Sequence, residues 1–173
     1  MLLDHGANVN AKFCFVCMTF DDRECPIHNF YGPPLLKAVQ DDFIDGIHLL
    51  LKYGANPDCF WNDIEYGHST PPLCQAVMDK NLAVVSLLLD NGASVHMESF
   101  LTFVDEKGLS HYVLGSPLMK AVDDNFLEEV VLLLRHGANP LDRSSAYNNP
   151  LDLAIRKGYY DIIDVLSSAA VSE

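Results

Sequence analysis

Three times in this chain, a proline is followed 20 residues later by a glycine and the residues between the two follow one shared pattern. Apolar residues recur three and four positions apart, a short polar run interrupts them, and a second apolar stretch ends with three leucines. Proline suits the first turn of a helix, and glycine suits the left-handed residue that ends one. The pattern therefore predicts pairs of short helices that need neighbours to cover their apolar faces. The three intervals are Pro34 to Gly54, Pro72 to Gly92 and Pro117 to Gly137.

The third copy shows the expected helix pair most clearly. Ser116 is a good N-cap residue for the helix that Pro117 begins, and apolar residues within 118–122 mark one face of that helix. The polar residues 123–125 suit a tight turn, because Asp and Asn favour turns and Asn tolerates a left-handed conformation. A second apolar helix is then expected over 127–134.

Two shortened copies flank the three complete ones, LLDHGANVN at 2–10 and NPLDLAIRKGYYDIIDVL at 149–166. Self-similarity at such a spacing indicates a repeat protein. The copies resemble the ankyrin repeat, whose pattern is T-P-L-H-x-A-A in the inner helix, V-V-x-L-L-L in the outer helix and G-A-x-V-N at the exit. The resemblance implies an all-α fold, an ankyrin-repeat solenoid of stacked helix-turn-helix pairs with β-hairpin fingers between them.

The connections between the copies vary in length, whereas the copies do not. From each exit glycine to the next inner proline are 28, 18, 25 and 13 residues. Only the last is the ordinary ankyrin connection, because a repeat of about 33 residues less 20 leaves 13. The extra 15, 5 and 12 residues fall in three fingers, and insertions on one face of an array are common binding sites. We expect one domain over 1–173, made of a partial repeat (1–12), a finger (13–32), a repeat (33–58), a finger (59–70), a repeat (71–96), a finger (97–115), a repeat (116–141) and a terminal repeat (142–168).

The two ends of the array are unusual for a repeat protein. Residues 1–10 begin inside an outer helix, so only a stub shields the first complete pair. This suits a fragment of a longer array, or an edge that a partner or a second copy covers. At the other end, Ser167 and Ser168 stand where earlier outer helices have leucines, and we expect the last helix to fray there and end the stack.

Composition narrows the classes of function. The net charge of −13 argues against nucleic acid and against an anionic membrane surface, which both attract clusters of Lys and Arg. No apolar run approaches the roughly 18 residues of a membrane span. The five cysteines are an odd number, and the N-terminus lacks the features of a secretory signal, so we expect reduced thiols or metal ligands. A cytoplasmic location, or a nuclear one, follows from this.

The first finger carries a candidate metal site. Cys14 and Cys17 form a C-x2-C pair, and Cys25 and His28 form a C-x2-H pair seven residues further on. Three thiolates and one imidazole suit tetrahedral zinc, and each two-residue gap lets a turn direct both ligands at one ion. We therefore predict one structural zinc, against the alternative that these cysteines are ordinary small apolar residues.

The other two fingers are predicted to differ from each other. The second contains an apolar and aromatic cluster in which Trp61 and Tyr66 either anchor a partner or fold onto the helices beneath. The third reads as an extended β-hairpin, with strands over 100–104 and 109–114 joined by a polar turn. His96 and His111 would face each other across that hairpin.

The ankyrin resemblance also implies a binding surface. In ankyrin proteins the exposed ends of the inner helices and the fingers line a concave surface that holds protein partners. The aspartates at these positions either bind a basic segment of a partner or only end helices and keep the array soluble. Carried over by position, the surface consists of Gln40, Asp41, Met78, Asp79, Asp123, Asp124, Arg156 and Lys157.

No enzyme signature accompanies this surface. The seven histidines are dispersed, the chain has no G-x-S-x-G elbow and no phosphate-binding glycine loop, and the carboxylates are expected on solvated faces. We therefore predict a protein–protein interaction module, an adaptor or scaffold, rather than a catalyst. The alternative is a zinc-stabilised regulatory subunit in which the first finger makes the decisive contact.

Overall fold

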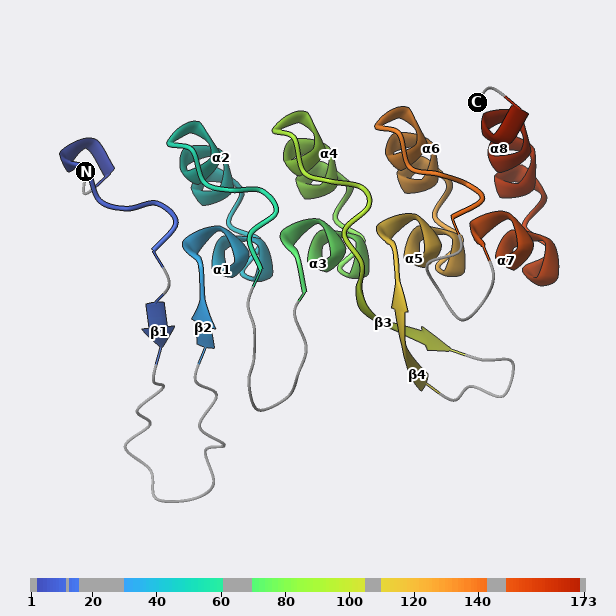
Figure 1. Cartoon of the computed structure of the whole chain (residues 1–173), viewed down its shortest axis with the longest axis horizontal. Helices are drawn as coiled ribbons and strands as arrows, with labels where there is room; N and C mark the ends of the chain where they lie inside the picture. The colour runs from blue at the N-terminus through green and yellow to red at the C-terminus, as the bar shows by residue number, and fades with distance from the viewer. Residues whose placement is uncertain are drawn as a thin grey trace, which may run out of the picture.

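The computed structural model describes residues 3–11, 13–15, 30–60, 70–104, 110–142 and 149–171 of the chain. Within these ranges, eight α-helices form four consecutive hairpins that stand side by side in a row (Figure 1). The described chain is therefore mostly helical, as the sequence predicted. The helices are α1 (Pro34–Gln40), α2 (Ile44–Lys52), α3 (Pro72–Met78), α4 (Leu82–Asp90), α5 (Pro117–Asp123), α6 (Leu127–Arg135), α7 (Pro150–Lys157) and α8 (Tyr160–Val171).

The hairpins build two layers of helices. The first helices of the hairpins, here called inner helices, contact one another in series from α1 through α3 and α5 to α7. Of the second, outer helices, α4 contacts α6 and α6 contacts α8. Each inner helix also packs on its own outer helix, so every hairpin is covered by its neighbours as well as by itself.

The turn inside each hairpin contains one residue with a left-handed backbone, at φ between 52° and 71°. Three of these residues are not glycine, and a side chain in this conformation costs roughly 1–2 kcal/mol. A main-chain hydrogen bond offsets the cost, because the next amide donates to the carbonyl of a buried alanine in the inner helix at 2.9–3.1 Å. The four turns therefore share one backbone pattern, which defines equivalent residues in the four hairpins. The left-handed residues are Asp42, Lys80, Asn125 and Gly158, and the alanines are Ala38, Ala76, Ala121 and Ala154.

The helix ends match the prediction from the sequence. A proline stands in the first turn of every inner helix. Ser116 caps α5, since its hydroxyl accepts a hydrogen bond from the Met119 amide at 3.4 Å. The exit glycines of the first three hairpins and of the N-terminal stub have φ values from 81° to 88°, a conformation open to glycine without steric cost. The predicted left-handed stops are therefore confirmed.

The exit loops link one hairpin to the next through their polar side chains. The Asn10 side chain accepts a hydrogen bond from the Asn56 amide at 2.8 Å and donates one to the Gly54 carbonyl at 3.2 Å. In the next loop the Asp58 carboxylate accepts from the Ser94 amide at 2.8 Å. These bonds pair main-chain groups that lie outside the helices and strands, and they link each exit loop to the next.

The apolar core runs through all four hairpins without a break. In the first hairpin Leu35, Ala38 and Val39 are buried, whereas Leu49 and Leu50 are half-buried. Leu88, in the central outer helix α4, has an exposed fraction of 0%. Burial of each such side chain contributes roughly 1.5–3 kcal/mol, so the stability of the array rests on contacts between hairpins.

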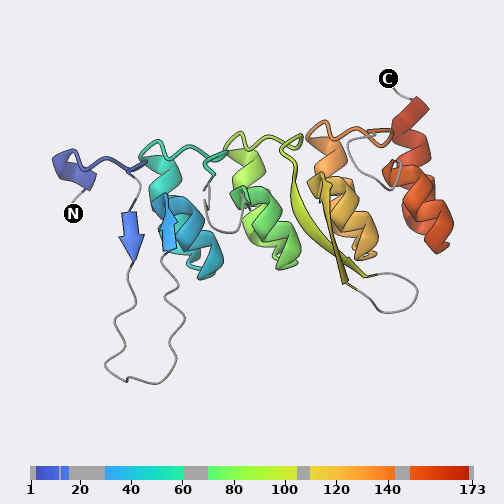
Figure 2. The same cartoon turned by 60° about the horizontal axis from the view of Figure 1, so that its bottom comes forward.

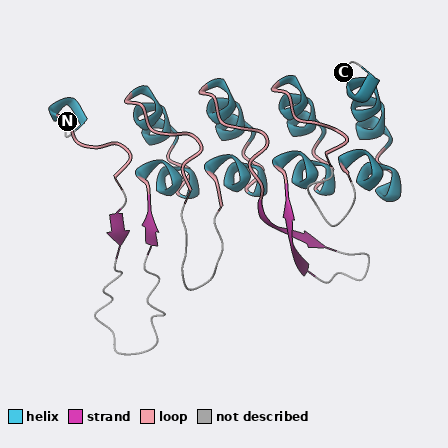
Figure 3. Ribbon diagram, viewed as in Figure 1, coloured by secondary structure: helices cyan, strands magenta, loops and turns pink. Residues whose placement is uncertain are grey.

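Two β-hairpins project from the inner layer (Figures 1 and 2). The strands β1 (Phe13–Phe15) and β2 (Phe30–Gly32) are antiparallel, as are β3 (Ser99–Val104) and β4 (Ser110–Gly115), drawn in magenta in Figure 3. The predicted hairpin in the third finger is confirmed. The prediction that His96 and His111 face each other is wrong, because His96 precedes β3 and His111 pairs with Phe103.

The two ends of the described chain differ from the expectation. Of the predicted outer helix at the N-terminus, the structure describes one short 3-10 turn, Leu3–His5. At the other end α8 continues to Val171, so the expected fraying near Ser167 is wrong. Among the described residues, no helix combines the length and the apolar character needed to cross a membrane.

Candidate interaction surface

The structure brings the predicted surface residues of four hairpins into one row. Each lies in the last turn of an inner helix or at its C-cap, and successive inner helices are in contact. Trp61 and Tyr66 lie outside the described residues, so their predicted role as anchors stays a prediction. The row, here called the inner-helix surface, consists of Gln40, Asp41, Met78, Asp79, Asp123, Asp124, Arg156 and Lys157.

The residues of the inner-helix surface differ in exposure. Gln40, Asp41, Asp79 and Arg156 are exposed, and Met78 is half-buried. The Asp41 carboxylate forms an ion pair with Lys37 one turn earlier, and Asp79 accepts a hydrogen bond from the Gln75 amide group at 2.9 Å. Both contacts are solvent-exposed, and such contacts are weak. The first half of the surface is therefore acidic and accessible.

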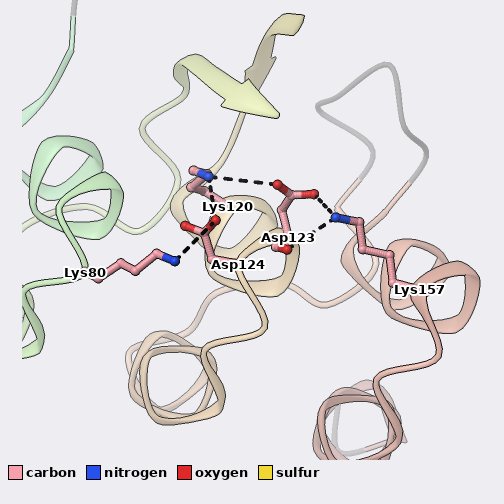
Figure 4. A network of polar contacts seen from close by, with 5 residues as sticks. All are labelled: Lys80, Lys120, Asp123, Asp124 and Lys157. Atoms are coloured by element: carbon pink, nitrogen blue, oxygen red, sulfur yellow. Dashed lines mark hydrogen bonds and ion pairs between the residues drawn. The ribbon is translucent and has the colours of Figure 1, made fainter. Parts of the chain in front are cut away.

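The second half contains a lysine–aspartate network made of Lys80, Lys120, Asp123, Asp124 and Lys157 (Figure 4). Lys157 lies 2.6 Å from the Asp123 carboxylate and donates to the Asp123 carbonyl at 3.3 Å. Lys120 lies 2.8 Å from Asp124 and 3.9 Å from Asp123, and Lys80 lies 3.8 Å from Asp124. The network thus joins three successive hairpins, because Lys80 precedes α4 and Lys157 ends α7.

Three side chains of this network are largely buried, so their pairing matters for stability. The side chains of Asp123 and Asp124 are only 7% and 15% exposed, and that of Lys120 is 11% exposed. A charge removed from water must be paired to be tolerated, and here three lysines surround two aspartates. The sequence left open whether these aspartates bind a basic segment of a partner or only end helices, and in the structure both carboxylates are paired with lysines of the chain itself. The pairing of Lys120 with Asp124 has a sequence signal, since residues four apart on a helix are neighbours.

Glu129, in the first turn of α6, has an exposed fraction of 0%. Neither of its carboxyl oxygens has a hydrogen-bond partner among the described residues. The pKa of Glu129 is raised to about 8, chiefly by burial and also by the nearby Asp124 charge, while Lys80 and Lys120 oppose the rise. The expectation that the carboxylates lie on solvated faces is therefore wrong for Glu129.

Two thiols are also buried. Burial raises the pKa of Cys59 to about 11 and that of Cys74 to about 12. The Cys74 thiol donates to the Met97 carbonyl at 3.3 Å. Both are free cysteines whose high pKa keeps them as inert thiols, so they support the fold rather than a reactive site.

The structure does not describe the side chains of the predicted zinc ligands. The Cys14 side chain, Cys17, Cys25 and His28 are outside the described residues. In the ranges that are described, no group of three or more His, Cys, Asp or Glu side chains could hold a metal ion. The zinc site stays a prediction from the sequence.

No family model matches the chain, and no curated protein matches it at a significant level.

Proposed function

We propose that the chain is an ankyrin-repeat solenoid that works as a protein–protein interaction module, an adaptor or scaffold rather than an enzyme. The single observation that carries the proposal is the alignment of the inner-helix ends. Four equivalent helix ends lie in one row, and strand β3 contacts the inner helices α3 and α5. Such a surface suits an extended segment of another protein, because it offers side chains at regular intervals along one direction.

The chemistry of the surface favours a partner with basic and apolar groups. Asp41 and Asp79 supply exposed negative charge in the first two hairpins. Phe100 and Leu114 stand directly opposite each other on β3 and β4, and they are 43% and 39% exposed. Opposed residues of an antiparallel pair share one face of the hairpin, so the two form an apolar patch that suits an apolar side chain of the partner.

The same proposal includes the finer predictions from the sequence. We place the protein in the cytoplasm or nucleus, because an odd number of cysteines favours reduced thiols or metal ligands over disulfides. A structural zinc in the first finger would give that finger a fixed shape for binding. In the alternative function, the zinc-stabilised finger and not the inner-helix surface makes the decisive contact.

A comparison of capture by matched variants tests the proposal. Wild-type chain, an Asp41→Lys/Asp79→Lys variant and a Phe100→Ala/Leu114→Ala variant are immobilised, and the captured proteins are quantified. The control is Asp90→Lys, a charge reversal of a carboxylate that is 66% exposed on the outer helix α4. We expect a protein that wild type and the control capture equally and that both surface variants lose. Its binding to the wild-type chain is then measured with purified protein at two salt concentrations, since a basic partner should bind more weakly at high salt.

The outcomes separate the two functions. Equal capture by all four proteins would contradict the inner-helix surface as the binding site. A partner lost only when residues 16–29 are removed, or only after zinc chelation, would support the alternative. The variants carry exposed substitutions, so unchanged helicity and melting temperature are expected and confirm that folding is intact.

A further inference from the structure

The position of Glu129 is one that the fold reserves for small or apolar residues. Glu129 is the fourth residue after Asn125, which is the left-handed residue of its turn. The residues at the same position in the other hairpins are Gly46, Val84 and Ile162. All four positions are buried. The hairpin therefore folds without any need for a carboxyl group here, and Glu129 introduces a group that is costly to bury when charged.

The charged groups around Glu129 come from two hairpins. Lys80 belongs to the turn before α4, and Lys120 and Asp124 belong to the inner helix and turn of the hairpin that contains Glu129. The outer helices that contact α6 carry carboxylates of their own, but these are exposed: Asp90 on α4, and Asp161 and Asp164 on α8.

The two lysines do not neutralise Glu129 by direct pairing. Lys120 is held 2.8 Å from Asp124, and Lys80 lies 3.8 Å from the same carboxylate. Asp124 itself has one buried oxygen without a hydrogen-bond partner among the described residues. The unpaired buried oxygens thus gather at the two carboxyl groups, and ionisation of Glu129 would add a second negative charge next to Asp124 without a cation of its own.

We propose that Glu129 makes the α5–α6 hairpin sensitive to protons: the hairpin packs firmly when Glu129 is a neutral acid and is destabilised when Glu129 ionises. The pKa of Glu129 rises from 4.5 to about 8 on folding. The stabilisation from the bound proton is fully present below pH 4.5 and is lost as the pH rises through about 8. Half of the Glu129 side chains are ionised at a pH equal to this pKa of about 8, so small pH changes near this value alter the population of the charged form. This inference does not depend on whether the array binds a partner.

The test measures urea unfolding of wild type and Glu129→Gln at several values between pH 5 and pH 8.5. Glutamine has the shape of the neutral acid but cannot ionise. We expect the unfolding equilibrium constant of wild type, divided by that of Glu129→Gln, to rise by about 10²- to 10³-fold over this range. The raised thiol pKa values of Cys59 and Cys74 also make stability depend on pH, but both proteins carry them, so their effect cancels.

The matched control is Glu128→Gln, because Glu128 is the neighbouring residue in α6 and is exposed. Its ratio to wild type should stay constant with pH to within about threefold. If Glu129→Gln does not fold, Glu129→Val serves as the reference, since Val84 occupies the same position in the preceding hairpin.

A second measurement does not rely on a variant at Glu129. The carboxyl ¹³C resonance of Glu129 in folded wild-type protein should titrate with a midpoint well above 4.5. A midpoint near 4.5, or pH profiles of wild type and Glu129→Gln that run parallel, would overturn the proposal.

Discussion

The contact between Asp123 and Lys157 allows a quantitative test of how the hairpins are held together. The 2.6 Å pair joins α5 to α7, and the Asp123 side chain is 7% exposed whereas that of Lys157 is 28% exposed. Exposed ion pairs contribute about 0–1 kcal/mol, and loss of one partner of a fully buried pair costs about 3–5 kcal/mol. This pair is intermediate in burial. In Asp123→Asn, Lys157 keeps the Asp123 carbonyl at 3.3 Å and Lys120 keeps Asp124, so we expect a loss of about 2 kcal/mol.

A double-mutant cycle with Asp123→Asn and Lys157→Met measures the pair itself. Urea unfolding followed by circular dichroism should give a coupling free energy of about 1–2 kcal/mol. The control cycle uses Lys37 and Asp41, whose side chains are 36% and 53% exposed, and should give about 0.5 kcal/mol or less. Because the first pair joins two hairpins, its loss should also let the α7–α8 hairpin unfold earlier than the rest. A coupling no larger than that of the control would refute the inference that burial strengthens this contact.

Two further predictions concern the core and the first finger. Leu88 is 0% exposed, so Leu88→Asp should unfold most of the array, and Leu88→Ala should lower the free energy of unfolding by about 3–5 kcal/mol. The control is Ala83→Asp, on the exposed face of α4. A native melting curve for Leu88→Asp would contradict the stacked core. Protein purified without added metal should contain about one zinc per chain, and Cys25→Ser should lose it; binding should weaken at low pH, since thiolates must be deprotonated to bind. A metal-free wild-type protein in elemental analysis would contradict the zinc prediction.

The helices could be predicted from the sequence because their ends depend on local chemistry. Pro117 begins a helix because its fixed φ suits the first turn, and Gly137 ends one because glycine takes a left-handed backbone without steric cost. Asn125 was expected to tolerate the same conformation, and it has φ of 56°. The number of residues between such signals determines the hairpin, which is why the repeat could be recognised before any long-range contact was known.

The charge network could not be predicted in the same way, since it depends on residues far apart in the chain. Lys157 is 34 residues from Asp123, and only the stacking of α5 against α7 brings them together. The burial of Glu129 did have a signal that a simple reading of polarity misses. Glu128 and Glu129 are the same type of residue, but alignment of the turns places Glu129 at the position of Val84, which is buried in the core.

Asp124 connects the inner-helix surface to the buried acid, and this links the two proposals. Its carboxylate contacts Lys80 and Lys120 in the network, and its charge raises the pKa of Glu129. A basic group of a partner that settles near Asp124 would stabilise ionised Glu129 and lower its pKa, so binding would release a proton near neutral pH. Linkage is reciprocal: a rise in pH would then favour that partner while weakening the α5–α6 hairpin in the free chain. The affinity for a basic partner and the stability of the array would therefore change in opposite directions with pH.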